Sequence, residues 1–164
     1  MKNLLFLLTA VIILACGACV HQKTTEENTF SLNYYFSAET TYQRIEINEK
    51  KVSYTFFEDG AGKCAHWLQQ SPCWTQTDLK TKTKEIKRVE IDDLVDLLNL
   101  MHFMDLNSVY GGAGENQRYY ATMISVKLEG KEKTVTYQSF RDATPKPVAF
   151  QKIEDKILEF VKNM

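Results

Sequence analysis

Hydrophobic and polar residues alternate with a period of two through much of the chain, most clearly from residue 31 to 57 and from 119 to 140. This period places successive side chains on opposite faces of a strand, so it predicts β-structure. We expect strands over residues 31–36, 42–48, 52–57, 83–91, 119–129 and 133–140. Short polar stretches at residues 48–51 and 129–132 indicate hairpin turns between neighbouring strands.

Two other segments carry apolar residues at the three- and four-residue spacing of an amphipathic helix. The first is predicted to begin at an N-cap, Asp92 or Asp93, and to run to about Met104, with an apolar stripe of Leu94, Leu97, Leu98 and Met101. The second is predicted over residues 148–162, after two prolines. Hairpins combined with helices predict a single α+β domain. We expect an antiparallel sheet of about five to six strands with both helices packed on one face.

The N-terminus has a different pattern, because Lys2 precedes an apolar run over residues 4–14 that ends in Ile13-Leu14-Ala15-Cys16-Gly17. This arrangement resembles the lipobox signal of bacterial lipoproteins. The resemblance covers residues 1–17 and implies cleavage before Cys16, acylation of its thiol, and anchoring in a bilayer. It divides the chain into a signal peptide (1–15), a lipidated N-terminus with a flexible polar tether (16–29) and a globular domain (30–164).

Other interpretations of this segment stay open. An uncleaved anchor would rise only about 16 Å as a helix, against a hydrocarbon core of roughly 30 Å. An ordinary secretory peptide cut near Ala15 or Ala18 is a second alternative, and Cys19 is a weaker candidate lipid site. Gly17 follows the cysteine where inner-membrane retention signals usually carry Asp. The family analogy therefore favours an outer-membrane location, or the outer face of the plasma membrane in a host with one membrane.

The charge balance excludes one class of partner. The formal net charge is −1, with 20 Lys and Arg against 21 Asp and Glu, whereas nucleic-acid binding requires a clustered excess of positive charge. The local basic stretch of residues 80–88 contains Glu85 and is flanked by Asp78 and Glu90, and it is typical of an edge strand, where lysine discourages aggregation.

Three cysteines remain after Cys16, and an exported protein meets an oxidising compartment. Cys64 and Cys73 flank a short loop that contains Pro72, so we expect them to form a disulfide, worth roughly 2–3 kcal/mol. Free thiols are one alternative. A metal site is another, with Cys64, His66 and Cys73 as ligands and His102 or His21 as a fourth, although the paired spacing of structural zinc sites is absent. Cys19 is left without an internal partner.

No motif predicts catalysis. Residues 111–114 are glycine-rich but lack the Lys-Ser/Thr that a phosphate loop requires, and Gly-x-Ser-x-Gly does not occur. His102 lies in an apolar helix, and the carboxylate pairs Glu58–Asp59 and Asp92–Asp93 adjoin a turn or a cap. A carboxylate pair across a cleft stays the only enzymatic alternative. We therefore expect a protein that is not an enzyme and that uses no cofactor and no metal.

Trp67 and Trp74 are the candidate contacts for a partner, because aromatic side chains on a constrained loop are typical interface anchors. Packing of both rings against the sheet is the equal alternative. The sequence thus favours a non-catalytic envelope lipoprotein that binds an envelope protein or a cell-wall component. The second hypothesis is an immunity or inhibitor lipoprotein that neutralises a periplasm-acting toxin or hydrolase.

Overall fold

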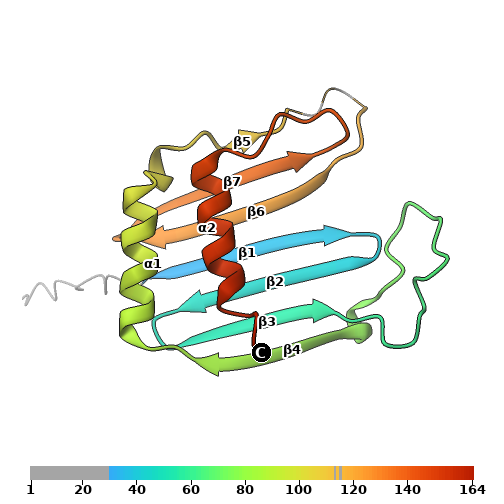
Figure 1. Cartoon of the computed structure of the whole chain (residues 1–164), viewed down its shortest axis with the longest axis horizontal. Helices are drawn as coiled ribbons and strands as arrows, with labels where there is room; N and C mark the ends of the chain where they lie inside the picture. The colour runs from blue at the N-terminus through green and yellow to red at the C-terminus, as the bar shows by residue number, and fades with distance from the viewer. Residues whose placement is uncertain (1–29, 113, 115) are drawn as a thin grey trace, which may run out of the picture.

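A computed structural model describes residues 30–112, 114 and 116–164 (Figure 1). The predicted signal peptide, Cys16, Cys19, His21 and the tether lie outside the described residues, so the expectations about them stay predictions. Within the described ranges, no helix is both long enough and apolar enough to cross a bilayer.

Seven strands of the described chain form one sheet in the order β4-β3-β2-β1-β6-β7-β5. Their bounds are β1 Ser31–Ala38, β2 Thr41–Asn48, β3 Lys51–Phe57, β4 Leu79–Glu85, β5 Val109–Tyr110, β6 Tyr120–Leu128 and β7 Lys131–Ser139. All neighbours pair antiparallel except β5, which runs parallel to β7. The expected antiparallel sheet of five to six strands is therefore corrected to a mixed sheet of seven. β5 has only two residues, too few to show a period in the sequence.

Helices α1 (Arg88–Leu100) and α2 (Val148–Glu159) both lie against the same face of the sheet (Figure 1). The α+β class with two helices is thus confirmed. Two short 3-10 turns, η1 (Gln76–Asp78) and η2 (Phe103–Asp105), precede β4 and follow α1. The core between sheet and helices includes the fully buried side chains Leu32, Ile45, Val52, Ile91, Leu94, Ile124, Val135, Phe150, Ile153 and Ile157.

Helix α1 begins at Arg88, so the predicted cap at Asp92 or Asp93 is wrong. The strand predicted over residues 83–91 exists but is shifted, since β4 runs from Leu79 to Glu85. The backbone N–H of Lys87 donates to the Glu90 carboxylate at 2.9 Å, which satisfies a donor that the helix start leaves free. Ile91, which we expected on a strand, is a core residue of the first turns. The helix ends earlier than expected because His102 takes a left-handed conformation with φ 50°.

The opposite face of the sheet carries no helix among the described residues, and we call it the open face. Side chains that point to it are mainly polar, because strand residues alternate between the core and this face. Hydroxyl groups pair across neighbouring strands here: Ser53 with Thr83 at 3.2 Å, Thr55 with Thr81 at 2.9 Å, and Ser125 with Thr134 at 2.8 Å.

Strand β4 is an outer strand of the sheet, as its basic composition predicted. Lys80, Lys82 and Lys84 are paired in register with Phe56, Tyr54 and Val52 of β3, so they lie on the helix-covered side. The three lysines form a stripe along this edge.

The start of β1 and the longest loops lie at opposite ends of the sheet (Figure 1). Phe30 lies where β1 begins. The turn between β1 and β2, the connection from β3 to η1 and the connection from β5 to β6 all gather at the other end, which we call the loop end.

Candidate functional site

The most prominent feature of the loop end is the connection over residues 58–75, which we call the disulfide loop. The structure brings the sulfur atoms of Cys64 and Cys73 to disulfide-bonding distance, with their Cα atoms 5.7 Å apart. Both cysteines are buried. Within the described ranges, no cluster of His, Cys, Asp or Glu is arranged to hold a metal ion. The geometry therefore suits a disulfide, the pairing expected from the sequence.

Hydrogen bonds within the disulfide loop fix its shape. The Asp59 carboxylate accepts the backbone N–H groups of Lys63 at 2.7 Å and Cys64 at 2.8 Å. At the far side of the loop, Nε1 of Trp67 donates to the carbonyl oxygen of Ser71 at 2.6 Å. The half-buried Trp67 ring is thus tied to the loop's own backbone.

Glu39, in the turn between β1 and β2, attaches the disulfide loop to the sheet. Its carbonyl oxygen accepts the N–H of Cys73 at 2.9 Å, and its carboxylate forms an ion pair with Arg118 and accepts the Tyr120 hydroxyl at 2.7 Å. Arg118 also donates to the carbonyl oxygen of Gln70 at 2.9 Å. Segments far apart in the sequence therefore meet at Glu39, through its carbonyl oxygen and its partly buried carboxylate.

Trp74 packs against the open face of the sheet. Its Nε1 donates to the carbonyl oxygen of Ala38 at 3.1 Å, and its ring makes an edge contact with Tyr42 at 4.9 Å between ring centroids. Tyr42 in turn contacts Tyr35 at 5.7 Å. Half-buried and hydrogen-bonded, Trp74 serves chiefly to hold the loop on the sheet.

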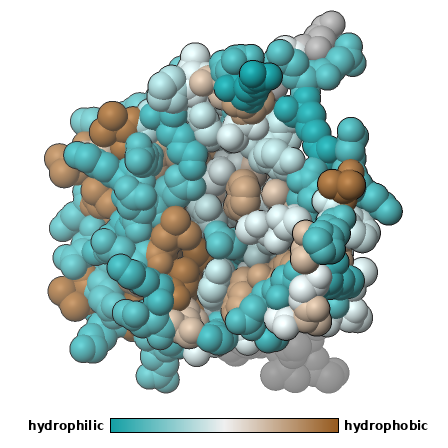
Figure 2. All heavy atoms as spheres, turned by 45° about the vertical axis from the view of Figure 1, so that its right-hand side comes forward, coloured by the Kyte–Doolittle hydropathy of each residue, from teal (hydrophilic) through white to brown (hydrophobic). Residues whose placement is uncertain are grey.

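Leu68, between the two cysteines, is the residue that the sequence reasoning did not single out. Its side chain is 96% exposed, the highest value among the large hydrophobic residues described. Figure 2 shows a mostly hydrophilic surface with separate hydrophobic areas, so a fully exposed leucine on a braced loop is a distinct feature. The available sequence pattern was an apolar Trp67-Leu68 pair followed by two glutamines between the two cysteines.

The base of the disulfide loop carries a charged hydrogen-bond network around Asp78. Its carboxylate accepts from Nζ of Lys63 at 2.7 Å and from the backbone N–H and hydroxyl of Thr75 at 2.7 and 2.9 Å. These donors, Lys63 foremost, lower the pKa of Asp78 to about 2. The network favours the charged carboxylate and closes the loop where it returns to the sheet.

We expect the Asp78 carboxyl to titrate in the folded protein with a midpoint near 2, below its ordinary value of 3.8. Because the folded-state pKa is lowered, the stabilising contribution of this group is complete above pH 3.8 and is lost as the pH falls toward 2. Carboxyl-selective NMR titration measures the midpoint. Replacement of Lys63 by Met should raise it, and an unchanged midpoint in that variant would contradict the assigned cause.

The other groups considered for catalysis make structural or solvent contacts. Glu58 pairs with Lys80 at 2.6 Å, and this partner lowers the pKa of Glu58. His66 is exposed, and His102 has Asp105 at 3.9 Å with both side chains largely exposed. In the described part of the chain, neither histidine side chain forms a hydrogen bond with a serine, threonine or cysteine.

Gly111 illustrates a structural use of the glycine-rich segment. Its φ is 92°, and a Cβ at this position would lie 2.0 Å from the carbonyl oxygen of Gln138 in β7. Only glycine allows the chain to pass this close to the strand. Gly111 is therefore explained by its close approach to β7.

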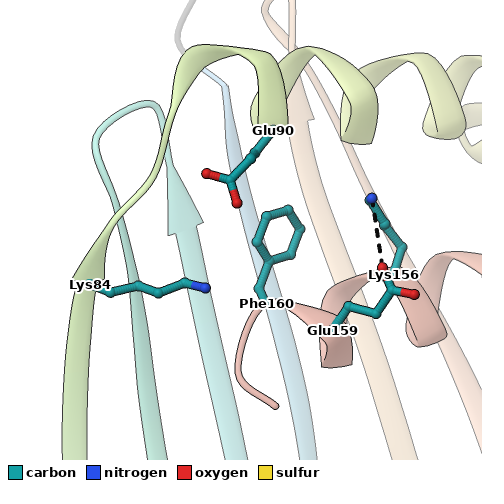
Figure 3. A pocket seen from close by; sticks show the side chains of 5 residues that line it. All are labelled: Lys84, Glu90, Lys156, Glu159 and Phe160. Atoms are coloured by element: carbon teal, nitrogen blue, oxygen red, sulfur yellow. Dashed lines mark ion pairs between the residues drawn. The ribbon is translucent and has the colours of Figure 1, made fainter. Parts of the chain in front are cut away.

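A cavity of about 190 Å³ lies between β4 and the ends of the two helices (Figure 3). Lys84 and Lys156 approach the Phe160 ring at 5.9 and 6.0 Å, and Lys156 pairs with Glu159 at 3.7 Å. With Glu90 also on its wall, the cavity has mixed charges, which gives it no selectivity for an anion or a cation.

Comparisons with known proteins add no assignment. No protein-family model matches the chain, and no curated protein sequence matches it. The function has to be inferred from the geometry above.

Proposed function

We propose that this protein is a membrane-anchored envelope lipoprotein that acts as a non-catalytic binding module and contacts an envelope protein through the disulfide loop. One observation carries this proposal: a leucine that is 96% exposed lies on a loop whose shape is fixed by Cys64, Cys73 and a set of hydrogen bonds. An apolar side chain held in water is stabilised when a partner covers it.

The energetic argument has two parts. Covering a fully exposed leucine contributes about 1.5–3 kcal/mol, which corresponds to a change in affinity of roughly 10- to 100-fold. A braced loop also loses little conformational entropy on binding, so more of this contribution appears as affinity. Trp67, half-buried beside Leu68, extends the apolar area.

The arrangement of the two ends supports anchoring at one and binding at the other. Residue 30 lies at one end of β1, and the disulfide loop lies at the opposite end (Figure 1). An eight-residue strand spans about 26 Å. If Cys16 is lipidated, as the lipobox resemblance implies, the anchor joins the domain at the end opposite the disulfide loop, which leaves the loop end accessible to a partner.

The second candidate is an immunity or inhibitor lipoprotein for a periplasm-acting toxin or hydrolase. The disulfide loop projects from the sheet (Figure 1), which favours this candidate because a projecting loop with an exposed apolar side chain is complementary to the cleft of an enzyme. The two candidates differ in whether the bound partner loses activity.

Site-specific photo-cross-linking tests the proposal. A photoreactive residue at position 68 should give a discrete adduct with one envelope protein in the native host. The same residue at Leu100, which is 69% exposed on α1, should not. With that partner purified, Leu68→Ser should weaken binding at least about 10-fold. Equal adducts from both positions, or an unchanged affinity of Leu68→Ser, would show that the disulfide loop is not the contact with the partner. Loss of the partner's hydrolytic activity on binding would favour the inhibitor candidate.

Protein purified from the same cells also tests whether the chain is lipid-anchored. Intact-mass analysis should show acyl chains on the mature protein that disappear in Cys16→Ser. A mature N-terminus at any other residue would refute lipidation at Cys16 and would leave the loop contact to be judged by the cross-linking.

A further inference from the structure

The open face of the sheet contains a shallow depression of about 360 Å³. Its polar and aromatic walls come from four adjacent strands and include Asn33, Tyr35, Arg44, Met123, Ser125 and Glu132. The strand register arranges most of them in two rows. Arg44, Tyr35 and Met123 lie side by side across β2, β1 and β6, and Asn33 lies beside Ser125 in the next row.

Several polar groups of this depression are not used by the protein itself. In the described part of the chain, the Asn33 amide, the Tyr35 hydroxyl and the Glu132 carboxylate have no hydrogen bond or ion pair. Asn33 and Glu132 are exposed, and Tyr35 is half-buried. Arg44 pairs only with Glu46, at 2.7 Å, and about half of its side chain stays exposed. The depression therefore presents donors and acceptors that a ligand can satisfy.

The aromatic part of the depression is fixed in place. Tyr35 makes an edge contact with Tyr42 at 5.7 Å, and Tyr42 is buried between Tyr35 and Trp74. This chain of rings runs from the centre of the face to the disulfide loop. A rigid, half-exposed ring among free polar groups provides an apolar contact without an ordering cost.

The chemistry of the depression distinguishes between classes of ligand. The large exposed hydrophobic residues of the described chain do not line it, and the side-chain groups on its walls that lack a partner are polar. Its lining carries one cation, Arg44, and one anion, Glu132, with Glu46 and Lys127 beside them, so it does not select a polyanion such as nucleic acid. Free hydroxyl, amide, guanidinium and carboxylate groups around an aromatic ring match a neutral polyhydroxylated molecule.

We propose that this depression binds a neutral oligosaccharide. The Tyr35 ring contacts the apolar face of a sugar ring, and Asn33, Arg44 and Glu132 form hydrogen bonds with its hydroxyl or acetamido groups. The inference goes beyond the proposed function, because it concerns a second surface and a different class of ligand from the protein contacted by Leu68.

Isothermal titration calorimetry of the full-length protein in neutral detergent micelles provides the test. The probes are neutral hexasaccharides of β-1,4-glucose, α-1,4-glucose, β-1,4-mannose and β-1,4-N-acetylglucosamine. At least one should bind with a dissociation constant below about 1 mM, a binding free energy near −4 kcal/mol. Absence of binding by all four would overturn the proposal.

Matched variants locate the binding. Asn33→Ala and Tyr35→Ala should each weaken binding at least about 5-fold, whereas Tyr35→Phe should retain part of it because the ring remains. Thr81→Ala, on the open face but outside the depression, should bind as the wild type does. Circular dichroism shows which variants fold, and Asn33→Ala, at an exposed position, decides the question if Tyr35→Ala does not fold. Equal loss in Thr81→Ala would overturn the assignment.

The test of oligosaccharide binding is independent of the test of the proposed function. Leu68→Ser should leave oligosaccharide binding unchanged, and Asn33→Ala should leave the adduct formed from position 68 unchanged. A protein adduct from a photoreactive residue placed at Met123 would show that the open face is a protein interface, and it would overturn the inference of an oligosaccharide site.

Discussion

Replacing Leu98 with alanine should lower the free energy of unfolding by about 2–5 kcal/mol. Leu98 lies on the face of α1 that packs on the sheet and is 2% exposed. The substitution removes its buried methyl groups and leaves a cavity that the neighbouring side chains only partly fill. Urea denaturation followed by circular dichroism measures the change from the shift of the midpoint at constant slope.

Leu100→Ala on the same helix is the matched control. Its side chain is largely exposed, so the same chemical change should alter the unfolding free energy by no more than about 0.5 kcal/mol. Equal effects of the two substitutions would show that the buried face of α1 is not the one described.

Replacing Glu154 with alanine should destabilise the domain by about 2–4 kcal/mol. Glu154 lies on α2 and is buried; its carboxylate accepts the Tyr34 hydroxyl at 3.2 Å and Nζ of Lys146 at 2.6 Å. Burial, followed by the charge of Glu154, raises the pKa of Tyr34 above its ordinary value. Without Glu154, a buried hydroxyl and a largely covered ammonium group lose their partner. Thermal and urea denaturation measure the loss.

A double variant separates the loss of a partner from the net value of the pair. Lys146→Met combined with Glu154→Met replaces both charges by apolar groups of similar size, which is often neutral or stabilising for buried pairs. We expect it to be more stable than Glu154→Ala. A double variant as unstable as the single one would indicate that the loss arises from the Tyr34 hydroxyl, which lacks its acceptor in both variants, and not from an unpaired Lys146.

Sequence patterns correctly predicted the elements whose own residues carry a clear strand or helix period. The alternation over residues 119–140 gave both strands of the β6–β7 hairpin, and the apolar spacing after Pro147 gave α2 at its observed start. The start of α1 was misplaced because Val89 and Ile91 fit a strand period as well as the first helical turn. The backbone of Lys87, capped by Glu90, decides between them.

The candidate site depends on contacts that a local pattern does not contain. The exposure of Leu68 results from the attachment of its loop to Glu39 and Arg118, residues 29 and 50 positions away. Trp74 was a reasonable candidate contact from the sequence, yet its ring is used to pack on Tyr42. Strand β5 is likewise defined by its pairing with β7 and not by its own two residues.

The lysine stripe on β4 affects how copies of the protein interact at high local concentration. If two copies paired their outer strands antiparallel about Lys82, this residue would face its own equivalent, and Lys80 would face Lys84 of the other copy. Like charges directly opposed across two strands are destabilising. If the protein is lipid-anchored as proposed, copies in one leaflet would thus pass each other without merging their sheets, and the loop end of each would stay accessible.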